Sequence, residues 1–161
     1  MLTFEELYIA YSPDVYRFAN WLAGNSADAE DITSETFVRA WRSLDAARTE
    51  TLKAYLFTIA RRIYLESLRK NRIHEALDEA RPDAAPPAQK RMEDQSDLDL
   101  VSHILQSLPE LDRSAFVMRI QSDLPYAEIA RVLQLTESAV KVKVHRTRKK
   151  LFAEFSRKEA T

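Results

Sequence analysis

The stretch "PYAEIARVLQLTESAVKVKVHRTRKKL", from Pro125 to Leu151, decides the fold of the C-terminal third of this chain. Apolar residues recur every three to four positions on both sides of a short break around Gln134, which predicts two helices. The second helix is basic, because residues 136–151 hold six Lys or Arg residues and one acid. Two short helices, a tight turn and a basic second helix are the parts of a helix-turn-helix.

The second of these helices has a predicted buried stripe of Val140, Val144, Thr147 and Leu151, and Thr136 is placed to cap its N-terminus. The opposite face suits a DNA major groove, where early side chains meet base edges and later cations meet phosphates. The candidate DNA-binding residues are Ser138, Ala139, Lys141, Val142, His145, Arg146 and Lys149. An amphipathic hairpin with a solvated basic face would give the same pattern. Gln134 stands where such turns often have Gly, and it can adopt the required backbone at modest cost.

Composition predicts an all-helical fold. The chain has 161 residues, 30% charged and 45% hydrophobic, with one Gly, and it is rich in Ala, Leu, Arg and Glu. It has no Cys, which excludes disulfides and fits a reducing compartment. No apolar run approaches the roughly 20 residues of a membrane span, and no signal peptide is visible, so we expect a cytoplasmic protein.

A formal net charge of -1 hides a strong asymmetry along the chain. Residues 1–50 hold nine acids and four bases, whereas residues 51–72 hold six bases and one acid. Together with residues 136–151, this makes two separate basic segments. An anionic partner would therefore be met in two places.

A Pro-rich and acid-rich run, residues 74–97, predicts a flexible linker between two small helical domains, residues 1–73 and 98–161. The first domain reads as one helix, or two joined at Ser12-Pro13, ending at Gly24. A second helix follows from Asn25 or Ser26, and a third begins near Thr51. Spacing predicts that Trp41 and Tyr55 lie in the core.

Enzyme chemistry finds little support in the sequence. The three His residues have no metal-ligand spacing, and a single Gly cannot make a phosphate-binding loop. Adjacent acids such as Glu30 and Asp31 point in different directions on a helix and form no acid–base pair. We therefore predict no catalytic residues, no metal and no cofactor.

Three stretches, "DAEDITSETFVRAW", "AYLFTIARRIYLESLRK" and "YAEIARVLQLTESAVKVKVHRTRKKL", resemble the signature segments of extracytoplasmic-function (ECF) sigma factors of bacterial RNA polymerase, in the sigma-70 family. Their order and separations match as well. The resemblance implies a sigma region 2-like bundle, a linker and a sigma region 4-like helix-turn-helix. Region 2 would bind the downstream promoter element and help to melt it, and region 4 would bind the upstream element.

The resemblance also implies partners and sites: core polymerase, through its beta-prime clamp helices and beta flap, promoter DNA, and an anti-sigma factor. The clamp-docking residues would be Asp31, Glu35, Val38, Arg39 and Arg42. The downstream-element residues would be Arg48, Thr49, Thr51, Lys53, Arg61, Arg62 and Arg69. Val142 departs from the family, which often has a small polar residue there, so no promoter consensus follows.

Two other functions remain open on the sequence. A stand-alone helix-turn-helix regulator would use its first domain for a ligand or for dimerisation, and it would bind a palindromic operator without polymerase. A helical adaptor would not touch DNA. Co-elution with core polymerase, and initiation where core alone fails, separates these functions.

Overall fold

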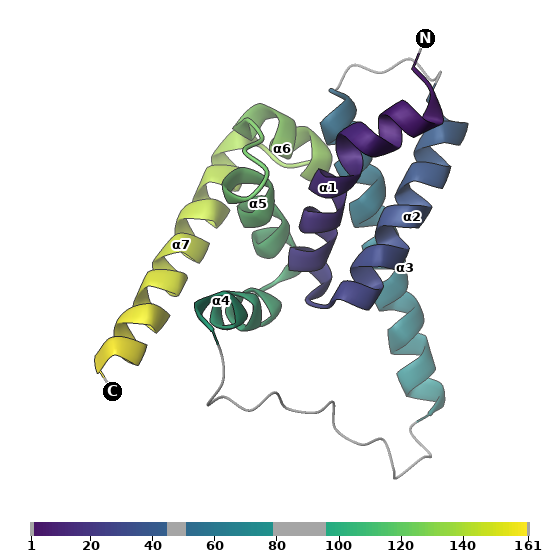
Figure 1. The fold of residues 1–161 in the computed structure, drawn as a ribbon. Coiled ribbons are helices and arrows are strands. Elements are labelled where there is room, and N and C mark those ends of the chain that lie inside the picture. The colour runs from purple at the N-terminus through teal and green to yellow at the C-terminus, as the bar shows by residue number, and fades with distance from the viewer. Residues whose placement is uncertain (1, 45–50, 79–95, 161) are drawn as a thin grey trace.

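The computed structural model describes residues 2–44, 51–78 and 96–160, and this part of the chain is helical with no strand. The predicted all-helical class is confirmed (Figure 1). The helices are α1 (Phe4–Ala23), α2 (Ser26–Arg42), α3 (Leu52–Leu77), α4 (Asp97–Gln106), α5 (Glu110–Ile120), α6 (Tyr126–Leu133) and α7 (Glu137–Ala160).

Local sequence signals set the ends of the first helices. Thr3 and Glu6 form a capping box at the start of α1. Gly24 ends α1 in the left-handed conformation with φ 82°, and the Asn25 side chain then accepts the Asp28 N–H at 2.8 Å. α1 is a single helix although it contains Pro13. It bends along its length in Figure 1, as expected where proline removes one backbone hydrogen bond.

Helices α1, α2 and α3 bury one shared apolar core. Phe18 of α1 and Phe57 of α3 stack with ring centroids 4.6 Å apart, and both are fully buried. Phe37 of α2 closes the same core and meets Tyr8 edge-to-face at 5.0 Å. Aromatic pairs of this kind add to the hydrophobic stabilisation that their burial provides.

Helices α6 and α7 make the predicted helix-turn-helix. Gln134 ends α6 in the left-handed region with φ 56° and ψ 46°, so it takes the turn conformation that Gly often supplies. Thr136 then caps α7 by accepting the Ala139 N–H at 3.1 Å. Val140, Val144 and Thr147 are buried on the inner face of α7, as predicted, and Leu151 is half-buried.

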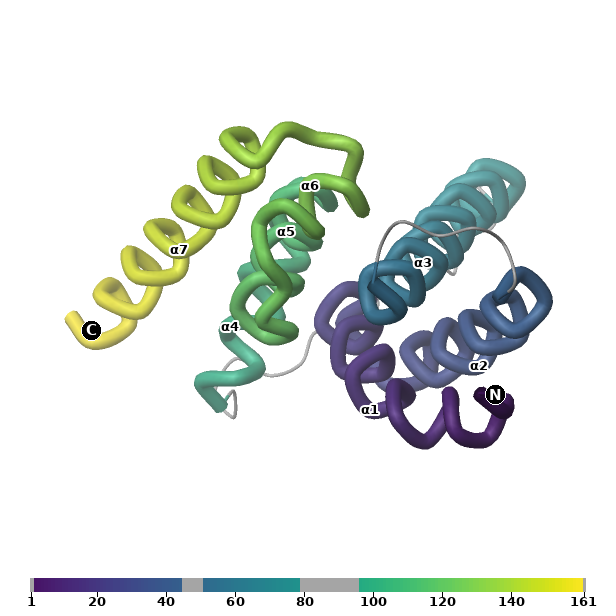
Figure 2. The backbone as a smooth tube through the Cα atoms, turned by 90° about the horizontal axis from the view of Figure 1, so that it is seen from above, coloured from purple at the N-terminus to yellow at the C-terminus, as the bar shows by residue number. Residues whose placement is uncertain are grey.

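The second group of helices packs directly on the first. α4 and α5 contact α1, and α6 contacts α3. Figures 1 and 2 both place α5 and α6 between α7 and the α1–α3 bundle. The buried apolar residues of the two groups form one continuous cluster.

Two expectations from the sequence need correction. Trp41 is 41% exposed instead of buried, because it lies at the end of α2, where its ring meets that of Phe4 edge-to-face at 5.7 Å. α3 continues to Leu77, so residues 74–77 are helical where a linker was expected to begin. No Gly or Pro lies between Thr51 and Pro82, which explains why α3 extends this far. The remainder of the expected linker, residues 79–95, lies outside the described residues.

Candidate nucleic-acid and protein interfaces

The outer face of α7 presents the predicted groove-reading residues to solvent. Lys141, His145 and Lys149 follow one another at one-turn intervals, and all three are exposed. Val142 is 53% exposed and offers a methyl-sized apolar contact. Ser138 and Arg146 are also exposed, whereas Ala139 is half-buried beside the turn. The structure thus brings all seven predicted residues onto one helix, six of them fully at its surface.

Tyr126, the first residue of α6, organises cations at the edge of this face. The Arg119 guanidinium lies 4.2 Å from the ring centroid, and the Lys141 ammonium lies 5.5 Å from it. Such contacts hold a long side chain near one position while leaving its charge available. Tyr126 could not be predicted from the sequence, because its ring comes close to Lys141 only where α6 and α7 cross.

Lys143 belongs to the basic run but does not belong to the exposed face. Its ammonium lies 3.5 Å from Asp112 of α5, and the two side chains are only 19% and 14% exposed. This ion pair ties α7 to α5. The cation therefore helps to hold the helix-turn-helix against α5.

The basic segment of α3 divides into two sets of residues. Arg62 and Arg69 are exposed, seven positions apart on one side of the helix. Thr51 caps the helix by accepting the Ala54 N–H at 3.2 Å, so its hydroxyl has a structural role as well. Arg48 and Thr49 lie outside the described residues.

Lys53 and Arg61 are half-buried, in contrast to the exposed Arg62 and Arg69. The Lys53 ammonium donates to the Ser122 carbonyl at 2.8 Å, and the Arg61 guanidinium pairs with Glu110 at 2.7 Å. Both acceptors belong to the C-terminal group of helices. α5 and the α5–α6 connection therefore cover the side of α3 that carries these two residues, and their role in DNA binding stays a prediction.

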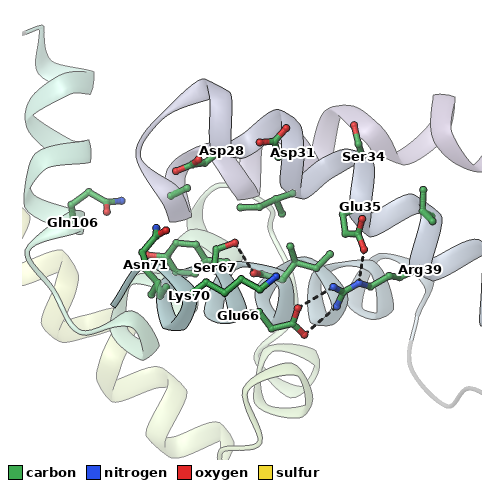
Figure 3. Close-up of a pocket in the computed structure, with 16 residues that line it drawn as sticks. Asp28, Asp31, Ser34, Glu35, Arg39, Glu66, Ser67, Lys70, Asn71 and Gln106 are labelled. Atoms are coloured by element: carbon green, nitrogen blue, oxygen red, sulfur yellow. Dashed lines mark hydrogen bonds and ion pairs between the residues drawn. The ribbon is translucent and has the colours of Figure 1, made fainter. Parts of the chain in front are cut away.

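The outer face of α2 carries the predicted protein-docking residues. Asp31, Glu35, Val38 and Arg42 are exposed, and Arg39 is half-buried between two carboxylates. Its Nε donates to Glu35 at 3.0 Å, and its Nη2 donates to Glu66 of α3 at 2.9 Å (Figure 3). The hydrogen bonds that Arg39 donates to Glu66 and Glu35 raise the pKa of Arg39, and the bond to Glu66 lowers the pKa of that carboxyl group.

Glu66 is a site residue that the sequence analysis missed. It is the one acid in the basic segment 51–72, which is a signal that could have marked it. Together with Glu35 it fixes the Arg39 fork at the mouth of a cleft of about 660 Å³ between α2 and α3. Figure 3 shows Asp28, Asp31, Ser67 and Lys70 around the same cleft. The mixture of charges suits a polar protein surface better than a small apolar ligand.

A second, smaller cleft is almost entirely apolar. It has a volume of about 250 Å³ and lies where α4, α5, α7 and α1 meet. Leu98 and Ile120 at this cleft are 66% and 48% exposed. Its other apolar lining residues are Trp21, Val101, Leu105, Phe116, Val117 and Leu151.

In residues 2–44, 51–78 and 96–160, no group of three or more His, Asp or Glu side chains could hold a metal ion. None of the helices in these ranges is long and apolar enough to cross a membrane.

Comparisons with known proteins match both groups of helices. The family model of sigma-70 region 2 matches residues 7–73, and that of sigma-70 region 4 matches residues 98–151. The ECF RNA polymerase sigma factor SigE of Mycolicibacterium smegmatis is 35% identical over 156 residues. That alignment covers 94% of this chain, and the chain spans 61% of the length of SigE.

The ferric citrate uptake sigma factor FecI of Escherichia coli is 30% identical over 144 residues, which cover 87% of this chain and 83% of FecI. Among solved structures, the sigma factor RpoE in complex with the anti-sigma factor NepR from Bartonella quintana has a similar fold, with a TM-score of 0.77. The match covers 92% of this chain and 93% of RpoE at 24% identity. The chain belongs to the sigma-70 family of RNA polymerase sigma factors, in its extracytoplasmic-function group.

Proposed function

We propose that this sigma factor binds core RNA polymerase and places its two helical modules on two promoter elements. The observation that carries the proposal is the outer face of α7, where Lys141, His145 and Lys149 are exposed at one-turn spacing on a capped helix-turn-helix. A helix of this kind fits the major groove, where a protein can read bases directly.

The upstream element would be read by the first two turns of α7. Lys141 can donate to guanine, and Val142 can contact a thymine methyl but cannot hydrogen-bond to a base edge. Arg146 and Lys149 lie farther along the helix, where they would neutralise phosphates.

The downstream element would be met by the basic side of α3 together with the segment that precedes it. Arg62 and Arg69 offer exposed cations. Arg48 and Thr49 stay predictions for the capture of an unstacked base, since they lie outside the described residues. Thr51 stays a prediction for the same contact.

Polymerase binding would use two further surfaces. The exposed face of α2, with Val38 among Asp31, Glu35 and Arg42, suits docking against the charged helices of the beta-prime clamp. The apolar cleft around Leu98 and Ile120 suits an apolar helix, and we assign it to the beta flap. Two modest DNA contacts would then be joined through the polymerase, which multiplies their combined affinity.

In this function the chain has no catalytic activity of its own and needs no cofactor, because the polymerase carries out the chemistry. It would act in the cytoplasm, where the polymerase works. RpoE, which has a similar fold, is seen bound to an anti-sigma factor. We infer that an anti-sigma factor also binds this chain.

The proposal is tested by adding the purified chain to core polymerase. Co-elution in gel filtration, followed by initiation at a defined site on a template that core alone does not use, is the expected result. Binding of the free chain to a palindromic operator, without any effect on core polymerase, would instead identify a stand-alone regulator.

A further inference from the structure

The contact between the two groups of helices includes a charged cluster around Arg61 and Glu110. Arg61 of α3 donates from Nε to both oxygens of Glu110, at 3.1 and 2.9 Å, and from Nη2 to Oε1 at 2.7 Å. The side chains are only 17% and 15% exposed. Ser114 donates to the same carboxylate at 2.7 Å. The guanidinium edge that could grip a phosphate is therefore occupied.

Other hydrogen bonds also hold the second group of helices against the first. Arg113 of α5 is 5% exposed, and its Nη2 donates to the Tyr64 hydroxyl of α3 at 2.6 Å. Lys53 donates to the Ser122 carbonyl at 2.8 Å, two turns before Arg61 on α3. Gln106 of α4 donates to the Leu22 carbonyl at 3.0 Å, at the end of α1. These three contacts and the Arg61–Glu110 pair all join the first module to the second.

Covering of α3 is selective. Lys53 and Arg61 face α5 and the α5–α6 connection, whereas Arg62 and Arg69 remain exposed. A carboxylate presents two oxygens to an arginine fork much as a phosphate does, and one fork cannot hold both. Glu110 thus satisfies Arg61 in the way that a DNA phosphate would.

We infer that Glu110 acts as an internal substitute for a promoter phosphate at Arg61, so that the free chain holds itself closed and must open before α3 can use all of its cations. This inference rests on the proposed function, since it takes Arg61 as a DNA-binding residue. Closure lowers the affinity of the free chain for DNA in proportion to the fraction of molecules that are open. A partner that separates the modules restores the full basic face.

The test compares the full chain with Glu110→Gln, which keeps the size of the side chain and removes its charge. The matched control is Glu154→Gln, which removes one charge from the same module at a surface pair with Arg157. Because the chain has no Cys, Glu30→Cys on α2 and Arg157→Cys on α7 allow specific attachment of a fluorophore pair to each protein. In the labelled proteins, which lack Arg157, Glu154→Gln still controls for the charge. Energy transfer reports the separation of the modules, and anisotropy with a forked DNA duplex reports affinity.

We expect Glu110→Gln to lower energy transfer and to strengthen DNA binding by about tenfold, equivalent to about 1.4 kcal/mol. Glu154→Gln should change neither. The charge-swapped pair Arg61→Glu with Glu110→Arg should return energy transfer to the wild-type level. Its DNA affinity should stay below that of Glu110→Gln, because the cation then lies on α5. Circular dichroism shows whether each variant is folded.

Unchanged energy transfer in a folded Glu110→Gln protein would overturn the inference. Opening without any gain in DNA affinity would overturn it too, since Arg61 would then not be a phosphate-binding residue. Failure of the proposed function would appear separately, as a wild-type chain that does not support initiation by core polymerase.

Discussion

The lysines of α7 show how side chains of one type take different roles on one helix. Lys141 lies 5.5 Å from the ring of Tyr126, Lys143 pairs with Asp112, and Lys149 is exposed. A helix turns by about 100° per residue, so neighbouring cations in the sequence face different surroundings. Only the position relative to the buried stripe of Val140 and Val144 separates them.

Substitution of each lysine by alanine should therefore have a different effect. Lys141→Ala should reduce discrimination of the upstream element by roughly 1–3 kcal/mol, the worth of a good base contact. Lys149→Ala should weaken binding to all sequences and lower the salt slope by about one unit, since one phosphate contact is lost. Holoenzyme binding to matched and scrambled elements across a salt series measures both effects.

Lys143→Ala provides the internal control for this series. It should lower the melting temperature through loss of the Asp112 pair and leave sequence preference unchanged. Identical behaviour of Lys141→Ala and Lys149→Ala would show that α7 does not read DNA.

Val38 permits a sharp test of the polymerase-docking face. It is 40% exposed among charged neighbours on α2, and we expect Val38→Asp to abolish co-elution with core polymerase. An exposed substitution of this kind changes stability by about 0.5 kcal/mol or less, so the melting temperature should stay nearly constant. A large drop in melting temperature alongside lost binding would show that Val38 is needed for the fold.

At the scale of the element, the turn between α6 and α7 depends on one residue in an unfavourable conformation. Gln134 has φ 56°, a region in which a residue with a Cβ is strained, and its side chain is exposed. Gly relieves the strain but adds entropy to the unfolded chain. We expect Gln134→Gly to stabilise the protein by about 0.5–1 kcal/mol on balance. We expect β-branched Gln134→Val to destabilise it, as measured by thermal unfolding.

Most element boundaries could be predicted because local interactions set them. Gly24, Asn25 and Thr136 were expected to end or cap helices, and they do so. Trp41 could not be placed from periodicity alone, because it continues the apolar stripe of α2 past the point where a neighbouring helix covers it. Its exposure depends on where α1 begins, which the sequence of α2 does not contain.

At the scale of the whole molecule, the packing of one module on the other was beyond local pattern. Arg61 and Glu110 lie 49 residues apart, and each belongs to a helix whose amphipathic pattern is complete without the other. The basic run on α3 predicted an anionic partner, and part of that partner proves to be the chain's own α5. Charge complementarity can be read from sequence, but the choice between an internal and an external partner requires the fold.

The Glu110 carboxylate also makes the contact between the modules sensitive to acid. Burial raises the pKa of Glu110, but the hydrogen bonds from Arg61 and Ser114 and the nearby positive charges outweigh burial, so the net pKa is lowered from its usual 4.5. A lowered pKa in the folded state means that the stabilisation is complete above the unfolded value. It is lost as pH falls through the lowered pKa.

Thermal unfolding of the wild type and Glu110→Gln over a pH series tests this consequence. Near neutral pH the variant should be less stable by about 1–2 kcal/mol, below the full cost of breaking a deeply buried pair because both side chains retain some exposure. That loss corresponds to about 2–8 °C in melting temperature for a chain of this length. The difference should hold down to about pH 4.5 and then shrink, because a protonated Glu110 resembles Gln. A difference that persists undiminished at pH 3 would mean that the charge of Glu110 does not hold the modules together.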